Sequence, residues 1–291
     1  MKFDNHPLAS ATSWLFVPAS RPERIAKALA SGADAVIVDL EDAVAPHEKE
    51  SARQALLQAF GALPAKQRAQ VVVRINAGGT PWFAGDVQAL QTLVADGGAG
   101  VMLPKAEDAA TLQQLLPALG NHGVIVPIIE SVNGLHAIDA IAASPQVLRL
   151  AFGHLDFQVD AGMACAPDET ELVPVRLAVV LASRRANLPA PMDGVTTNTQ
   201  DGTVTRADAE RALRGGFGGK LCIHPAQVSE VNAAFTPTDA QLQSAQQILD
   251  AASAAQGGVC VVNGRMVDAP VIALATKTVQ RHRIAAARAT R

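Results

Sequence analysis

Short β-branched apolar runs recur along this 291-residue chain, and most are followed by a turn and an Ala-rich amphipathic stretch. Cores such as Val36-Ile37-Val38 and Val71-Val72-Val73 are apolar on both faces, as strands covered on both sides of a parallel sheet must be. Strands alternating with helices predict a parallel α/β fold. The eight runs expected to form strands are Trp14–Pro18, Ala35–Leu40, Val71–Asn76, Gly100–Pro104, Val124–Glu130, Leu148–Gly153, Ala190–Val195 and Lys220–His224.

Eight strand–helix units within roughly 250 residues predict a (β/α)8 TIM barrel. A doubly wound sheet is the structural alternative, but no G-x-G-x-x-G motif follows the first strand. The helical patterns between the strands include Pro46–Phe60, Ala106–Leu119 and Val173–Asn187. We therefore expect a barrel domain over residues 1–235.

Residues 236–291 are expected to form an extension to the barrel. Thr236-Pro237-Thr238-Asp239 predicts a turn and a helix N-cap, followed by a helix over Ala240–Ala255 that Gly257-Gly258 ends. A hairpin of Val259–Val262 and Arg265–Val267 around Asn263-Gly264 is expected next, and then a last helix.

Composition excludes several classes of protein. The net charge is −3 without a basic run, which argues against nucleic acid or an anionic membrane as the main partner. No apolar run is long enough to span a bilayer, and Met1–Ser13 lacks the pattern of a signal peptide. Three cysteines without metal-ligand spacing indicate a reducing compartment. We expect a cytoplasmic enzyme.

Polar residues stand where the predicted strands end, which is where a (β/α)8 barrel carries its active site. Each has an ordinary structural explanation, but a whole ring of them at one rim favours a site. The residues of this ring are Arg21, Asp39, Glu41, Asp42, Arg74, Asn76, Lys105, Glu130, Asp156, Asp193 and His224.

Glu130 and Asp156 are the candidate metal ligands. Each follows an apolar run, the two runs are adjacent in the predicted barrel, and Mg²⁺ prefers one or two carboxylates with water and substrate oxygens. In the alternative, each carboxylate caps the following helix or pairs with an arginine, and the spacing leaves both interpretations open.

Arg74 ends a buried strand and suits bidentate binding of a substrate carboxylate. An ion pair with Asp39 or Glu41 is the alternative, and both roles are compatible. Lys105 is a candidate Schiff-base lysine or, more commonly, a structural ion-pair partner. His224 is either catalytic or a hydrogen-bonded residue that closes the barrel.

The order and spacing of several motifs resemble the citrate lyase β-subunit family, within the larger group that also holds malyl-CoA lyases and pyruvate-dependent aldolases. The resemblance covers nearly the whole chain, including Asp268-Ala269-Pro270. The motifs that carry it are Ser13-Trp14-Leu15-Phe16-Val17-Pro18, Asp39-Leu40-Glu41-Asp42-Ala43-Val44, Val73-Arg74-Ile75-Asn76, Leu103-Pro104-Lys105, Ile129-Glu130-Ser131 and Gly219-Lys220-Leu221-Cys222-Ile223-His224-Pro225.

The resemblance implies a carbon–carbon lyase with Mg²⁺ as cofactor, Mn²⁺ being a possible substitute. It implies that Glu130 and Asp156 bind the metal and that Arg74 grips the carboxylate of the oxo acid. It further implies that Asp268 is an acid/base supplied to a neighbouring subunit, in a trimer or a multiple of it, where the extension covers the neighbour's site.

Two positions depart from the family's pattern. An acid usually precedes the metal-binding Asp, but here Leu155 precedes Asp156, which removes a charge beside the metal. Ala19 stands where the first loop usually has a glycine.

Three functions remain in competition at this point. The leading one is Mg²⁺-dependent cleavage or formation of a 3-hydroxy-carboxyacyl thioester of the citramalyl-, malyl- or citryl-CoA type, giving an oxo acid and an acyl thioester. The second is a CoA-independent oxo-acid aldolase. The third is a non-catalytic subunit that acts only inside a citrate lyase complex, with an acyl-carrier protein as partner.

Overall fold

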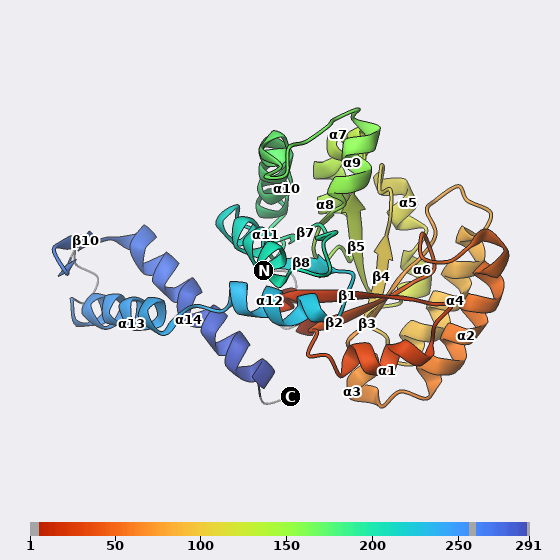
Figure 1. The fold of residues 1–291 in the computed structure, drawn as a ribbon, viewed down its shortest axis with the longest axis horizontal. Helices are drawn as coiled ribbons and strands as arrows, with labels where there is room; N and C mark the ends of the chain where they lie inside the picture. Colours follow the sequence, from red (N-terminus) through yellow and green to blue (C-terminus); the bar gives the residue numbers. More distant parts are fainter. Residues whose placement is uncertain (1–5, 256–259, 290–291) are drawn as a thin grey trace. The chain divides into compact units, whose positions relative to one another are not determined.

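The computed structural model describes residues 6–255 and 260–289 (Figure 1). The chain divides into two compact units, Met1–Val231 and Asn232–Arg291, with the division inside helix α12. Among the described residues no helix is long and apolar enough to cross a membrane.

The first unit is a closed barrel of eight strands in sequential order, as expected. Every strand runs parallel to its neighbours, and register pairs such as Phe16 with Ile37 and Val38 with Val73 define the ladder. The strands are β1 (Ser13–Pro18), β2 (Ala35–Asp39), β3 (Val71–Arg74), β4 (Gly100–Leu103), β5 (Val124–Ile129), β6 (Ala151–Phe152), β7 (Met192–Asp193) and β8 (Gly219–Cys222).

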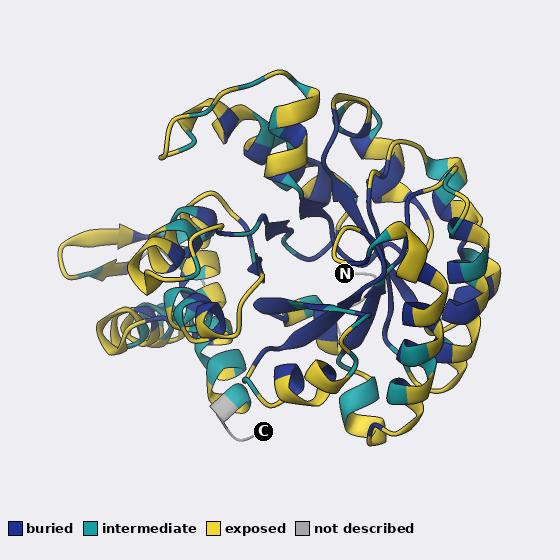
Figure 2. Cartoon of the chain, turned by 45° about the vertical axis from the view of Figure 1, so that its right-hand side comes forward, coloured by how far each residue is buried: buried dark blue, intermediate teal, exposed yellow. Residues whose placement is uncertain are grey.

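Helices surround the barrel and expose their polar faces, while nearly all residues of the barrel strands are buried (Figure 2). This arrangement satisfies strands that are apolar on both faces, because one face fills the lumen and the other packs on the helices. The helices are α1 (Glu23–Leu29), α2 (Lys49–Gly61), α3 (Ala65–Arg68), α4 (Phe83–Ala95), α5 (Ala109–Gln113), α6 (Leu116–Leu119), α7 (Val132–His136), α8 (Ile138–Ala143), α9 (His154–Asp160), α10 (Val173–Arg185), α11 (Gly202–Arg214) and α12 (Ala226–Phe235), with 3-10 turns η1 (Pro7–Ser10), η2 (Pro46–Glu48) and η3 (Thr170–Leu172).

The amino-terminal end of the barrel is closed. Leu8 of η1 belongs to the core cluster that fills the lumen together with Trp14. Arg149, just before β6, is buried there and donates hydrogen bonds to the backbone carbonyls of Leu8, Ala11 and Ala190. Three carbonyl partners satisfy a buried guanidinium that would otherwise be costly to desolvate.

The second unit contains α13 (Asp239–Ala254), a hairpin of β9 (Cys260–Val262) and β10 (Arg265–Val267), and α14 (Ala269–Ala289). Thr238 caps α13 through a reciprocal capping box with Gln241, as the turn sequence indicates. Asn263 and Gly264 both have positive φ, which an Asn-Gly hairpin turn requires. The predicted helix stop at Gly257-Gly258 lies outside the described residues.

Candidate active site

A cavity of about 400 Å³ lies at the carboxyl-terminal ends of the barrel strands. Its walls combine four carboxylates, one arginine and one histidine with an apolar surface. The loops that follow the strands converge at this end of a (β/α)8 barrel, so side chains from distant parts of the sequence meet there. The charged and ionisable groups in the wall are Asp39, Asp42, Arg74, Glu130, His154 and Asp156.

Arg74, the last residue of β3, is held by Asp39 at the end of β2 and by Glu41 in the loop that follows. Its Nε and Nη2 donate to the two carboxylate oxygens of Asp39, both at 2.7 Å, and Nη1 lies 2.8 Å from Oε2 of Glu41. Burial alone would lower the pKa of Arg74, but Asp39 and Glu41 raise it. Two of the five N–H groups of the guanidinium thus donate to Asp39, whereas Nη1 contacts Glu41 as an ion pair without hydrogen-bond geometry. N–H groups on the terminal nitrogens remain for a ligand, and both predicted roles of Arg74 are compatible.

Asp39 organises this corner of the site. Its buried carboxylate also accepts the backbone N–H groups of Glu41 and Ala43, which ties the loop after β2 to the arginine. The neighbouring Glu41 is 6% exposed, and burial raises its pKa to about 7 against the opposing charge of Arg74. Asp39 and Glu41, predicted as alternative ion-pair partners of Arg74, both lie directly against the guanidinium.

Glu130 lies directly after β5, and no basic side chain among the described residues is in hydrogen-bonding contact with it. Its Oε1 accepts the backbone N–H of Lys105 at 2.6 Å. Lys105 adopts a left-handed backbone with φ of 46°, an uncommon conformation for a residue with a side chain, and this directs the N–H toward the carboxylate. Burial raises the pKa of Glu130 to about 8, and the nearby carboxylates of Glu41 and Asp156 add to the effect.

Gly153, between β6 and α9, allows Glu130 to approach the next strand. A β-carbon at this position would lie 2.4 Å from Oε2 of Glu130, closer than any real contact. Asp156 follows in the first turn of α9 and lines the same cavity. The two predicted metal ligands therefore face one space from neighbouring strand ends.

The donor set fits a hard divalent cation. Glu130 is a buried carboxylate beside two further acids, so negative charge is in excess there. No group of three or more His, Cys, Asp or Glu side chains within residues 6–255 and 260–289 is arranged to hold a metal. A pair of carboxylates that leaves the other positions to water and substrate oxygens is typical of Mg²⁺, whereas a closed zinc site would need more protein ligands.

A buried ion network supports the α9 end of the site. His154, the first residue of α9, is 4% exposed, and its Nε2 lies 3.1 Å from Oε1 of Glu169. Glu169 also pairs with Arg176 of α10 and with Arg211 of α11, and Arg176 in turn pairs with Asp193 of β7. Partial burial would raise the pKa of Glu169, but the contacts with His154 and Arg176 outweigh it and lower the pKa to about 2.

Three residues of this arrangement were not predicted as site residues: Gly153, His154 and Glu169. A glycine placed directly between an apolar run and the predicted ligand Asp156 is the signal that points to Gly153 and His154. Glu169 has no such signal, because its partners come from three different helices.

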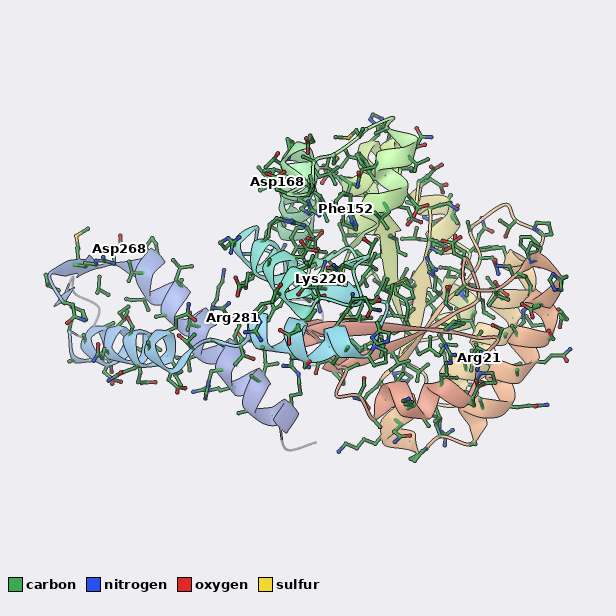
Figure 3. The ribbon with its side chains drawn as sticks, in the orientation of Figure 1. Arg21, Phe152, Asp168, Lys220, Asp268 and Arg281 are labelled. Atoms are coloured by element: carbon green, nitrogen blue, oxygen red, sulfur yellow. The ribbon has the colours of Figure 1, made fainter. Side chains whose placement is uncertain are left out.

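The remaining predicted residues Lys105, Arg21 and His224 do not line this cavity. Lys105 is half exposed, and its Nζ lies 3.5 Å from Oε1 of Glu41, so it is an ion-pair partner. It lines a second cavity of about 580 Å³ beside α4 and α5. Arg21 is exposed, pairs with Glu23 at 2.7 Å, and lies well away from Phe152 of the cavity wall (Figure 3). His224 is exposed and accepts the backbone N–H of Ala226.

Asp268 belongs to the second unit. Its Oδ1 accepts the backbone N–H of Val271 at 3.2 Å, so it caps the start of α14. The side chain is partly exposed. Its assignment to a neighbouring subunit's site remains a prediction.

Fold and site together define a (β/α)8-barrel enzyme with paired carboxylates and an anchored arginine at the carboxyl-terminal rim. The chain belongs to the HpcH/HpaI aldolase/citrate lyase family, whose match covers residues 12–225. The predicted family and the predicted class of enzyme, a carbon–carbon lyase, are thereby confirmed.

Individual relatives agree with this membership. A "citrate lyase subunit beta-like protein" of Deinococcus radiodurans is 37% identical over 93% of this chain and 97% of its own length. A "(3S)-malyl-CoA thioesterase" of Cereibacter sphaeroides is 32% identical over the full length of both chains. The crystal structure of CitE from Mycobacterium tuberculosis in complex with magnesium, acetoacetate and coenzyme A is 34% identical, covering 94% of this chain and 99% of that chain with a TM-score of 0.81.

Proposed function

We propose that this protein is a Mg²⁺-dependent lyase that cleaves or forms the carbon–carbon bond of a 3-hydroxy-carboxyacyl thioester of the citramalyl-, malyl- or citryl-CoA type. The products of cleavage are an oxo acid and an acyl thioester. The observation that carries the proposal is the shared cavity of Glu130, Asp156 and Arg74. It presents an acidic pair for a metal together with a guanidinium that donates only two of its N–H groups to Asp39.

Glu130 and Asp156 would hold the metal. When bound, Mg²⁺ lowers the pKa of a substrate hydroxyl and stabilises negative charge on an oxygen. The M. tuberculosis CitE complex with magnesium, acetoacetate and coenzyme A supports magnesium and coenzyme A as ligands of this chain too. Mn²⁺, which also prefers oxygen ligands, is a possible substitute.

Arg74 would bind the substrate carboxylate through the N–H groups of its terminal nitrogens that Asp39 does not accept. Because Asp39 fixes the guanidinium plane, the bound carboxylate is fixed as well, and the adjacent hydroxyl is held in one orientation. Such positioning contributes to the rate because the reacting groups no longer have to find each other.

Asp268 would be the acid/base at the carbon α to the thioester carbonyl. In cleavage it protonates the carbon released from the oxo acid, and in condensation it removes that proton. We propose that residues 236–291 bring Asp268 to a neighbouring subunit's site, so that the active unit is a homo-oligomer, a trimer or a multiple of it.

Free cysteines at positions 165 and 222 are consistent with a cytoplasmic location.

A thioesterase activity is the second candidate, because a relative that matches over its full length is named for hydrolysis of malyl-CoA. The two reactions differ in their products. Hydrolysis gives free CoA and a hydroxy acid, whereas carbon–carbon cleavage gives an oxo acid and leaves the thioester intact.

Incubation of the purified protein and Mg²⁺ with malyl-, citramalyl- and citryl-CoA tests both candidates. We expect an oxo acid, measured as its phenylhydrazone, together with an acyl-CoA of matching mass. Release of free thiol without an oxo acid would replace the lyase by the thioesterase. If none of the three thioesters yields an oxo acid or free thiol, both activities are contradicted. The CoA-independent aldolase or the subunit that depends on an acyl-carrier protein is then favoured.

A further inference from the structure

We infer that the oxo acid handled at this site is a 2-oxo monocarboxylate with a small apolar substituent, as in pyruvate or 2-oxobutyrate, and not a dicarboxylate such as oxaloacetate. The inference rests on the proposed function and selects among its substrates. Citramalyl-type thioesters are then preferred over citryl-type ones, because the two differ in the group attached to the oxo carbon.

The first argument is the supply of hydrogen-bond donors. Nε and Nη2 of Arg74 donate to Asp39, and Nη1 lies 2.8 Å from Glu41 and 3.6 Å from Asp42. The end of the guanidinium between its two terminal nitrogens remains, and it matches a single carboxylate in the bidentate fork. A second carboxylate on the same substrate would need another donor.

Within the described cavity wall no other basic group can supply it. His154 directs Nε2 at Glu169, and its Nδ1 is buried against Gly194, where a β-carbon would lie only 2.1 Å away. Lys105 lines the other cavity and pairs with Glu41. A second substrate carboxylate would lose water without gaining a partner, which disfavours its burial.

The second argument is charge. The wall carries four carboxylates and one guanidinium, so a divalent cation between Glu130 and Asp156 still leaves one negative charge in excess. A monocarboxylate adds one further negative charge and is held by the metal and Arg74. A dicarboxylate adds a second charge, which meets repulsion from the remaining acids.

The third argument is the apolar part of the wall. Leu155 and Ile223 both line the cavity although they are 41% and 42% exposed. They continue an apolar surface formed by Ile128, Val195 and Leu221. A methyl or ethyl substituent placed against this surface removes apolar area from water on both sides, whereas a carboxylate would be desolvated there.

The experiment uses a matched pair of oxo acids. 2-Oxobutyrate and oxaloacetate have the same number of carbons and differ in a terminal methyl against a terminal carboxylate. Each is supplied with acetyl-CoA and Mg²⁺ to the full-length protein, with pyruvate in parallel, and the thioester product is identified by its mass. Mass identification also separates true oxaloacetate turnover from turnover of pyruvate formed by its decarboxylation.

We expect kcat/KM for pyruvate and 2-oxobutyrate to exceed that for oxaloacetate by at least tenfold, with the same order in their Kd by calorimetry. Equal or better use of oxaloacetate would overturn the inference and leave the lyase in place. Failure of every oxo acid to give a thioester product, while the thioester cleavage screen is also negative, would remove the proposed function and the inference with it.

A pair of variants on one helix tests the role of the apolar wall. Leu155→Lys adds a cation to the cavity and should shift the ratio at least tenfold toward oxaloacetate. Val159→Lys adds the same cation on α9 at a side chain that is 83% exposed and outside the cavity wall, and it should leave the ratio unchanged. An unchanged ratio in a folded Leu155→Lys variant, or an equal shift in both variants, would contradict the proposed role of Leu155.

Discussion

Gly153 lies so close to Glu130 that a β-carbon on the glycine would come within 2.4 Å of Oε2 of the carboxylate and 2.6 Å of its Cβ. The backbone of Gly153 therefore limits the positions that the carboxylate of Glu130 can adopt. Gly153→Ala should displace Glu130 and weaken Mg²⁺ binding roughly 10- to 100-fold, the range typical for loss of groups that orient a metal ligand. Titration calorimetry measures the change.

Gly61→Ala is the matched control for that substitution. Gly61 ends α2, and a β-carbon there would meet no atom within 4 Å. Its Mg²⁺ affinity should equal that of the parent protein. Unchanged affinity in a folded Gly153→Ala protein would show that Glu130 can move without consequence for the metal.

Removal of either acid tests the metal site itself. Glu130→Gln and Asp156→Asn keep the size of the side chain but remove its charge, so each should abolish measurable Mg²⁺ binding and lyase activity. The control is Glu210→Gln on α11, whose side chain is half exposed, and this variant should bind Mg²⁺ with the parent's affinity. If both acid variants retained the parent's affinity, the metal would bind elsewhere.

Arg74→Lys keeps the positive charge but loses the planar fork. We expect KM for the oxo acid to rise at least about tenfold, because a lysine cannot serve Asp39 and a substrate carboxylate bidentately at once. The free energy of unfolding should fall by about 2 kcal/mol, because the buried Asp39 loses two charge-assisted hydrogen bonds. Steady-state kinetics and urea unfolding measure the two effects.

Arg185→Lys is the control, because Arg185 makes a similar pair with Asp139 at the exposed surface. Neither KM nor stability should change appreciably there. A loss of stability in Arg74→Lys with unaltered KM would reduce Arg74 to a structural role.

Glu169 makes stability depend on pH in a known direction. Its pKa is lowered from 4.5 to about 2 in the folded protein, so its stabilising contribution is present above pH 4.5 and is lost as the pH falls toward 2. Glu169→Gln should therefore be less stable than the parent by about 2 kcal/mol at pH 7, and the gap should close between pH 4.5 and 2. Urea unfolding across this range measures it; a constant gap would show that the charge of Glu169 is not the cause.

Mixing two inactive variants tests the place of Asp268. Asp268→Asn and Glu130→Gln are each expected to be inactive alone. If Asp268 serves a neighbouring subunit, exchange of subunits creates some sites with an intact metal pair from one chain and an intact Asp268 from another, and activity reappears. Verified exchange without recovery would place Asp268 in its own chain's site or outside the mechanism.

The barrel could be predicted because buried parallel strands leave a signal in the sequence. All eight runs form strands at the predicted places, although β6 and β7 contain only two residues each, Ala151–Phe152 and Met192–Asp193. Their predicted runs are longer because several flanking residues, such as Leu148, Leu150 and Val195, are also apolar. Burial gives these flanks the same composition as a strand even where they do not join the ladder.

The candidate site divides along similar lines. Glu130, Asp156 and Arg74 follow from strand ends alone, since a barrel gathers those ends at one rim. Contacts made by the backbone could not be predicted from the strand ends. Lys105 has a left-handed backbone and its N–H binds Glu130, but nothing in the sequence around Lys105 indicates this conformation. The same holds for Glu169, which contacts His154 only because the helices around it are packed in place.

The position of Arg149 bears on the route by which substrate and product enter and leave the barrel. With Leu8 and the carbonyls it binds, it closes the amino-terminal end of the barrel, so residues 6–255 leave no second entrance to the lumen there. A molecule therefore reaches Glu130 and Arg74 from the loops at the opposite rim and leaves by the same route. A bound product blocks the next substrate, so the turnover rate depends on how quickly product dissociates through the carboxyl-terminal rim.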